Sequence, residues 1–171
     1  MFAAAIALAA YIRARPRDYV PGGHALRFLF LTVFIWSAAQ GLSMFMKSPN
    51  AILLAAQFSY IGIALTPVAW FVFAITYSQR VRKISRHLFN TISVIPAITL
   101  LLALTNPQHA LIWSDWSFVE IEGFLGFVTE HGFWFYVHAV YSYSLILVGT
   151  AILAFALNQY RQHYQTLLAA V

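Results

Sequence analysis

Four long stretches that lack charge in their interior constrain this chain more than any other feature of its sequence. A helix that crosses a membrane needs about 20 mostly apolar residues. A charged side chain at mid-bilayer costs about 2.5–3.5 kcal/mol on insertion scales. Across the four stretches the single charged residue is Arg27, close to an end. They are predicted to be complete membrane-spanning helices at about 25–46, 51–77, 88–104 and 133–157.

The composition excludes an ordinary soluble domain. Hydrophobic residues make up 61% of the 171 residues and charged residues only 9%, whereas about a quarter of a soluble domain is charged. The net charge of +5 comes from short basic clusters between apolar runs. That pattern is typical of membrane topology and not of a nucleic-acid surface. We therefore expect an all-α, polytopic transmembrane bundle whose partner is the lipid bilayer, with no nucleic acid.

Two shorter apolar segments flank the four complete helices. Residues 1–12 and 166–171 are each too short to span a bilayer, so they are predicted to be partial helices. The arginines follow the first segment instead of preceding it, which argues against a cleaved signal peptide. We expect 1–171 to be one transmembrane domain, truncated at both ends. The chain has no cysteine, which excludes a disulfide.

The basic residues alternate between the predicted loops. Nine of the ten Lys and Arg residues fall on one side of the predicted membrane: Arg13, Arg15, Arg17, Arg27, Arg80, Arg82, Lys83, Arg86 and Arg161. The other side has only Lys47 and carries most of the acidic residues. By the positive-inside rule, loops 13–24, 80–87 and 158–165 are expected to be cytoplasmic and loop 106–132 extracytoplasmic.

The long outer loop has a pattern of its own. Residues 118–122 alternate apolar and acidic side chains, Gly123 and Gly126 flank an expected turn, and 127–129 can return as a second strand. This pattern predicts a short β-hairpin on the outer surface. A flexible loop is the alternative.

A proline interrupts the second complete helix. Pro67 removes one backbone donor and crowds the carbonyl of Ile63, which in lipid needs another partner, such as the Thr66 hydroxyl or a neighbouring helix. Tyr60 is predicted to lie on the same helical face as Pro67. The face is either a packing surface or the wall of a ligand site. Both interpretations also hold for Trp36, Gln40 and Ser43, which share a face of the preceding helix.

The entry to the last complete helix is rich in aromatic and polar residues. Trp134, His138, Tyr141 and Ser142 are spaced for one face. His138 is expected about one to two turns below the outer surface, and an ionisable group at that depth suggests a functional site. It could also report external pH. A neutral histidine bonded to a neighbouring carbonyl is the alternative, as an interfacial aromatic belt is for Trp134.

No pattern in the chain indicates catalysis. The acidic and histidine residues of the outer loop lack zinc spacing, and no glycine-rich phosphate loop or nucleophile motif is present. Both lysines lie in loops, so neither can form a retinal Schiff base within a helix. His138 is the single intramembrane histidine, one too few for a pair of haem ligands. We expect no catalytic residue, metal or cofactor in this segment.

Five motifs stand out along the chain, at residues 59–62, 66–71, 95–96, 105–113 and 132–143. The most specific are the stretch from Asn106 to Trp113 and the aromatic entry to the last complete helix. Together they resemble the seven-helix amino-terminal sensor region of bacterial histidine kinases, which also precedes some diguanylate cyclases. The resemblance implies an input module in the bacterial plasma membrane, a homodimer, and a cytoplasmic kinase or cyclase output domain in cis. It implies no particular stimulus.

We interpret the segment as a sensory input module whose stimulus acts on the outer half of the bundle. That stimulus is a small molecule, a change in the membrane or external pH. The residues expected to line or support the site are Tyr60, Pro67, Asn106, His109, Trp113, Trp134, His138 and Tyr141. The alternative is a subunit or fragment of a transporter or membrane assembly protein. Transporters place polar sites near the midplane, where this chain has few ionisable groups.

The charge pattern makes a direct prediction about orientation. A reporter enzyme that is active only outside the cytoplasm should be inactive when fused after Gln79 and active when fused after Ser114, because the basic loops are retained inside. The opposite pattern of activity would overturn the orientation.

Overall fold

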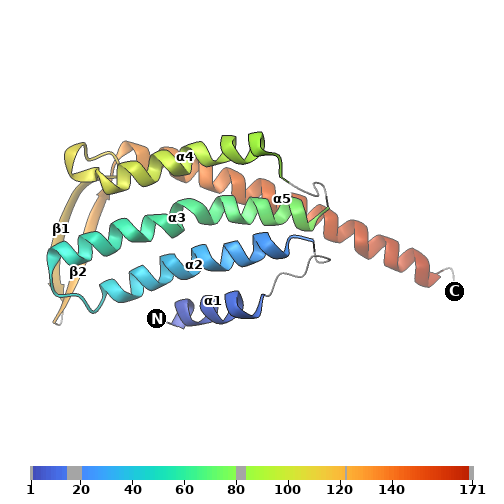
Figure 1. Cartoon of the computed structure of the whole chain (residues 1–171), viewed down its shortest axis with the longest axis horizontal. Coiled ribbons are helices and arrows are strands. Elements are labelled where there is room, and N and C mark those ends of the chain that lie inside the picture. Colours follow the sequence, from blue (N-terminus) through green and yellow to red (C-terminus); the bar gives the residue numbers. More distant parts are fainter. Residues whose placement is uncertain (1, 15–20, 80–83, 122, 170–171) are drawn as a thin grey trace.

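The computed structural model describes residues 2–14, 21–79, 84–121 and 123–169. Residues 121 and 161–169 are described by their backbone. Within these residues the chain forms five α-helices, one short 3-10 helix and one β-hairpin (Figure 1). In chain order the elements are α1 (Phe2–Arg13), α2 (Gly23–Ser43), α3 (Pro49–Tyr77), α4 (Arg86–Leu104), the 3-10 turn Asn106–Gln108, β1 (Trp113–Ile121), β2 (Phe124–His131) and α5 (Phe133–Ala169).

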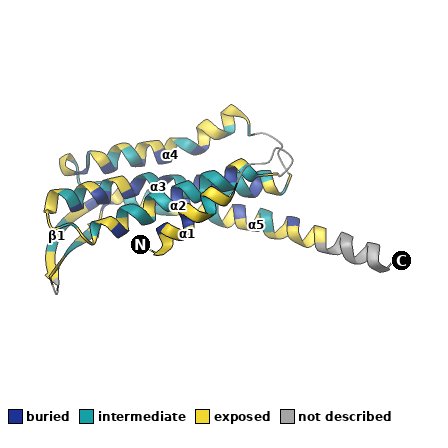
Figure 2. Ribbon diagram, turned by 60° about the horizontal axis from the view of Figure 1, so that its bottom comes forward, coloured by how far each residue is buried: buried dark blue, intermediate teal, exposed yellow. Residues whose placement is uncertain are grey.

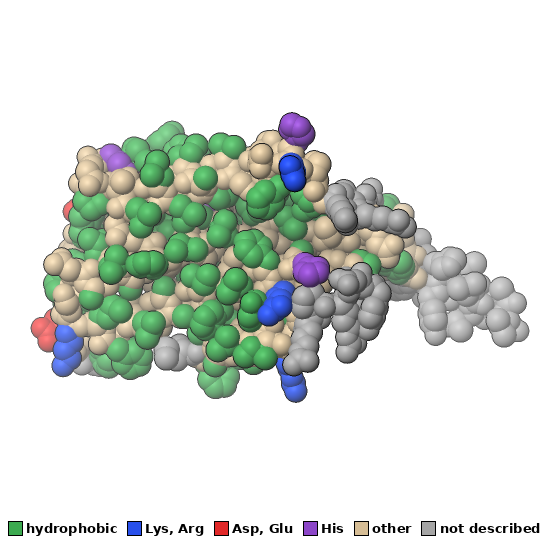
Figure 3. All heavy atoms as spheres, viewed as in Figure 1, with side chains coloured by type: hydrophobic (Ala, Val, Ile, Leu, Met, Phe, Trp, Pro, Cys, Tyr) green, Lys and Arg blue, Asp and Glu red, His purple; other side chains and the backbone are tan. Residues whose placement is uncertain are grey.

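The predicted helical bundle is confirmed. Helices α2, α3, α4 and α5 are each long and apolar enough to cross a membrane. They lie side by side, the hairpin covers one end of the bundle, and α5 extends past the other end (Figure 1). Large apolar side chains remain exposed along the outer faces of the helices (Figure 3), as expected for surfaces that face lipid.

Helix α3 is the centre of the bundle. In the most apolar 18-residue stretch of α3, 50% is buried, against 22% in the matching stretches of α2 and α4 and 17% in that of α5. Figure 2 shows the buried residues concentrated along α3. Small residues allow this central position, since helices approach closely in lipid where side chains are small. A Cβ atom added to Gly62 would lie 2.5 Å from the backbone oxygen of Thr32 and 2.5 Å from Cβ of Trp36. Glycine at 62 therefore lets α2 and α3 cross in direct backbone contact.

The described charged side chains separate to the two ends of the bundle (Figure 3). Arg13 ends α1, Arg27 lies in the first turns of α2, and Arg86 starts α4 at the end away from the hairpin. The guanidinium of Arg27 lies 4.4 Å from the ring centre of Tyr11, a cation–π contact between α2 and α1. The remaining basic residues expected on this side lie outside the described side chains: Arg15, Arg17, Arg80, Arg82, Lys83 and Arg161.

The predicted hairpin is also confirmed and is longer than expected. The register pairs Phe118 with Phe127 and Ile121 with Phe124, and the strands extend over Trp113–Ile121 and Phe124–His131 of the outer loop. Gly123 occupies the turn with φ +82°, a conformation that glycine adopts at no steric cost. Gly126, expected beside the turn, is instead within β2.

One predicted boundary is wrong. We expected a helix to end near 157, a loop at 158–165 and a further helix from 166, whereas α5 runs unbroken from Phe133 to Ala169. Residues 158–165 are polar but contain no proline or glycine. Loss of hydrophobicity marks the point where a helix leaves an apolar environment and does not by itself end the helix.

Replacing Gly62 with alanine should destabilise the protein. The added methyl group overlaps the backbone of α2, and such overpacking costs about 1–3 kcal/mol. Gly126→Ala is the control, because its Cβ would meet the carbonyl oxygen of Val119 at an ordinary 3.4 Å. Thermal unfolding in detergent measures both variants, and equal melting temperatures would contradict the close crossing.

Candidate functional site

Asn106 joins α4 to the hairpin. Its side chain is fully buried. Its Oδ1 accepts the backbone N–H of Ile112 at 2.8 Å and of Trp113 at 3.0 Å, and its Nδ2 donates to the carbonyl of Trp113 at 3.0 Å. Both acceptor positions of Oδ1 and one amide hydrogen are thus used within the chain. Asn106 therefore fastens the start of β1 to the end of α4.

His109 closes the same turn. Its Nδ1 accepts the backbone N–H of Leu111 at 3.0 Å, and its Nε2 lies 3.1 Å from the hydroxyl of Thr105. The Thr105 hydroxyl donates its single hydrogen to the carbonyl of Leu101, so Nε2 is the donor towards Thr105. The turn includes Ala110 at φ +55°, and these bonds hold its unusual backbone.

The residues that follow β2 pack against this turn. Gly132 donates its backbone N–H to Ile112 O at 2.9 Å, and Trp134 donates to Leu111 O at 2.9 Å. A Cβ atom at Gly132 would lie only 2.4 Å from the Leu111 oxygen, so only glycine fits. The hairpin and the start of α5 are therefore fixed to the end of α4 by backbone contacts.

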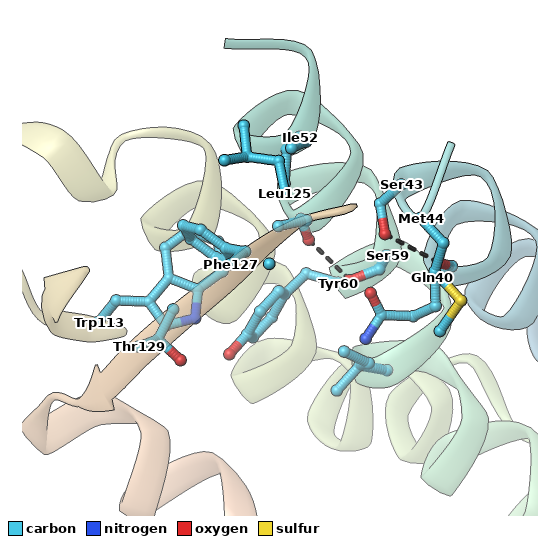
Figure 4. A pocket seen from close by; sticks show the side chains of 13 residues that line it. Gln40, Ser43, Met44, Ile52, Ser59, Tyr60, Trp113, Leu125, Phe127 and Thr129 are labelled. Atoms are coloured by element: carbon cyan, nitrogen blue, oxygen red, sulfur yellow. Dashed lines mark hydrogen bonds between the residues drawn. The ribbon is translucent and has the colours of Figure 1, made fainter. Parts of the chain in front are cut away.

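A cavity of about 360 Å³ lies between α2, α3 and the hairpin. Two of the predicted site residues, Tyr60 and Trp113, form part of its wall, with 5% and 4% of their surfaces exposed. Their rings meet edge to face at 5.4 Å, and Trp113 meets Phe127 in the same way at 5.5 Å. The cavity is lined by Gln40, Ser43, Met44, Ile52, Ala56, Ser59, Tyr60, Ile63, Trp113, Leu125, Gly126, Phe127 and Thr129 (Figure 4).

The polar groups of this cavity are all uncharged. The Ser59 hydroxyl donates to the carbonyl of Ala56 at 2.7 Å, and the Tyr60 side chain packs against that of Trp113. The side-chain amide of Gln40 and the hydroxyl of Thr129 have no hydrogen-bond partner in the part of the chain that the structure describes. The cavity therefore offers unpaired donors and acceptors beside aromatic rings.

A second polar group connects α4 with α5. The indole N–H of Trp134 donates to the Thr99 hydroxyl at 2.9 Å, and Nδ1 of His138 lies 3.3 Å from the same oxygen. Thr99 donates its own hydrogen to Ile95 O at 2.8 Å, so His138 Nδ1 has to be the donor. Nε2 of His138 lies 3.1 Å from the Ser142 hydroxyl. Thr99, with 0% exposure, is the centre of this group.

Pro67 links this group to α3. As expected, the proline leaves the carbonyl of Ile63 without its helical donor. The side chain of His138 on α5 contacts that backbone group, whereas the Thr66 hydroxyl lies 2.7 Å from the carbonyl of Gly62 instead. The side chain of Ile63 lines the cavity. One residue of α3 therefore contacts both the cavity and the polar group on α5.

The eight predicted residues thus occupy three places. Tyr60 and Trp113 line the cavity; Asn106 and His109 hold the hairpin junction. The other four belong to the contact among α3, α4 and α5: Pro67, Trp134, His138 and Tyr141, whose hydroxyl donates to the carbonyl of Ile92.

Several residues of these sites were not predicted as members. Thr99 is the main polar residue of its apolar surroundings in α4, a signal that could have been used. Leu125, Phe127 and Thr129 lie on one face of β2, but the sequence does not say which face of the hairpin turns towards the helices. Gln40 and Ser43 were considered as contacts between helices or with a ligand, and both line the cavity.

The fold and this arrangement define an integral membrane protein of the helical-bundle class. The chain belongs to the family described as the N-terminal 7TM region of histidine kinase, whose model matches residues 1–171. This region is the non-catalytic sensory input part of such kinases. Neither the curated proteins nor the solved structures gave a significant match.

Asn106→Ala should destabilise the hairpin junction. It leaves the buried N–H groups of Ile112 and Trp113 unpaired, and each unsatisfied buried group costs about 1–3 kcal/mol. Asn90→Ala, at an exposed position of α4, is the matched control. Hydrogen exchange of the Ile112 and Trp113 amides should speed up only in the Asn106 variant, and unchanged exchange would show that the side chain does not hold the junction.

Proposed function

We propose that this chain is the input module of a membrane-bound histidine kinase and that its stimulus acts in the cavity covered by the hairpin. The observation that carries the proposal is the cavity itself, of about 360 Å³ and walled by the buried rings of Tyr60 and Trp113. Concave sites that combine apolar walls with a few polar groups are the usual form of small-molecule sites. The family supplies the sensory role.

The orientation follows from the charge pattern. With the hairpin outside the bacterial plasma membrane, nine of the ten basic residues lie on the cytoplasmic side, in accord with the positive-inside rule. The acidic hairpin and its cavity then face the exterior or the outer leaflet. The end of α5 that extends past the bundle lies on the side of the output domain.

A change in the cavity can reach α5 through a single residue of α3, Ile63. The Ile63 side chain lines the cavity, and its backbone is in contact with His138. A ligand that displaces Ile63 or Tyr60 therefore changes the contact that α3 makes with α5. The response is a shift between two packings of these helices, passed along α5 to the cytoplasm.

The proposal also includes a cytoplasmic output domain. The family name favours a kinase domain in cis, and a diguanylate cyclase is the second form of output that the sequence resemblance implies. We propose that the full-length protein acts as a homodimer, as the resemblance implies.

Thr99→Val should shift the basal autophosphorylation of the full-length protein in membranes. The substitution keeps the shape of the side chain and removes the oxygen shared by Trp134 and His138. A shift of about 1.4 kcal/mol between two packings changes their ratio about tenfold, so a change of several-fold in output is expected.

Thr91→Val provides the matched control. Thr91 lies on the same helix, is exposed, and bonds the carbonyl of His87 in its own helix. Thermal unfolding confirms that both variants are folded. A folded, inserted Thr99 variant whose output equals that of the parent would refute transmission through this contact.

A further inference from the structure

We infer that the cavity beneath the hairpin takes an uncharged small molecule that combines a flat apolar ring with a group able both to donate and to accept hydrogen bonds. This inference rests on the proposed function, because it identifies the chemical class of the stimulus for the same cavity. Three properties of the lining lead to it: its charge, its ring geometry and its unpaired polar groups.

The lining carries no charged side chain, which disfavours an ion as the ligand. None of the 13 residues that line the cavity is Lys, Arg, Asp or Glu. An ion that leaves water for a site without an opposite charge pays a large desolvation penalty that nothing there offsets. Glu120 pairs with the lining residue Leu125 across the hairpin, but its side chain is exposed. Because the acidic Glu120 is paired with a lining residue, a cation is the kind of ion that could still find a partner near the cavity, and it has to be tested as well.

The rings of the lining favour a flat apolar ligand. Tyr60 and Phe127 stand nearly perpendicular to Trp113, at 82° and 90°, so the wall presents both ring faces and ring edges. A ligand ring can add an offset-stacked or edge-to-face contact to such a wall. Met44 follows the last residue of α2 and has 65% of its surface exposed, so its flexible side chain can adjust to the shape of the ligand.

The unpaired polar groups favour a ligand with both a donor and an acceptor. The Gln40 amide offers each kind of group, and the Thr129 hydroxyl offers each as well. The Ser59 oxygen can still accept, because its hydrogen is given to Ala56. These groups come from α2, α3 and β2 and surround one space (Figure 4). A volume of about 360 Å³ is near the lower end of the range of about 300–1,000 Å³ for ligand pockets, so the ligand is small.

Three probes of one shape test the inference. Benzamide, benzoate and benzamidinium share a ring and a planar substituent but are neutral, anionic and cationic at pH 7. Their binding to the protein in lipid nanodiscs is measured by ligand-observed NMR, with empty nanodiscs subtracted to remove partition into lipid. We expect benzamide to bind about tenfold or more tightly than either ion, a difference of about 1.4 kcal/mol.

Two hairpin variants locate the binding. Thr129→Val removes one hydroxyl from the cavity at constant shape and should weaken benzamide binding several-fold. Ser117→Ala removes a hydroxyl from the opposite, exposed face of the hairpin and should leave binding unchanged. Equal binding of either ion, or benzamide binding that both variants leave unchanged, would overturn the ligand class.

The ligand class and the proposed function can be tested separately. If benzamide shows the expected selectivity and the expected sensitivity to Thr129→Val, the ligand class holds. The stimulus role is then tested by adding benzamide to the full-length protein in the same nanodiscs. A several-fold change in autophosphorylation supports that role, and saturating benzamide without any change overturns it while the ligand class stands.

Discussion

The lack of water inside a membrane governs most of the polar contacts in this structure. Each buried polar group has to find its partner within the protein, since an unpaired one costs several kcal/mol in hydrocarbon. Thr32, Thr66 and Thr99 therefore bond carbonyls of their own helices. The carbonyl that Pro67 leaves free is contacted from another helix by His138. The contact proposed to pass a signal from α3 to α5 is thus also one that holds these helices together.

The end of the bundle that carries the hairpin differs from its centre. At the centre, Gly62 brings α2 and α3 into backbone contact and leaves no space for a ligand. Beneath the hairpin, larger aromatic side chains and a strand face the helices, and a cavity with unpaired polar groups remains. Asn106 and His109 fix the cover of that cavity without lining it. Support and recognition are therefore carried by different residues of one loop.

Some of the candidate site was predictable and some was not. Tyr60 was predictable because it shares a helical face with Pro67, and Trp113 because it belongs to the motif that carries the family resemblance. Their neighbours Phe127 and Thr129 depend on which face of the hairpin turns inward. The helix break expected at 158–165 failed because a fall in hydrophobicity reports solvent and not backbone geometry. Trp134 and His138 share a helical face, as predicted, but their common partner Thr99 lies 35 and 39 residues away.

The sequence by itself determined the membrane-spanning helices, the distribution of basic residues and the presence of a hairpin, because all three depend on short-range patterns of charge and hydrophobicity. Only the tertiary structure decided which polar groups were already paired. Asn106 bonds backbone groups six and seven residues ahead, and His138 reaches α3 and α4. Whether a polar side chain can bind a ligand depends on the hydrogen bonds left to it, and that depends on how the helices pack.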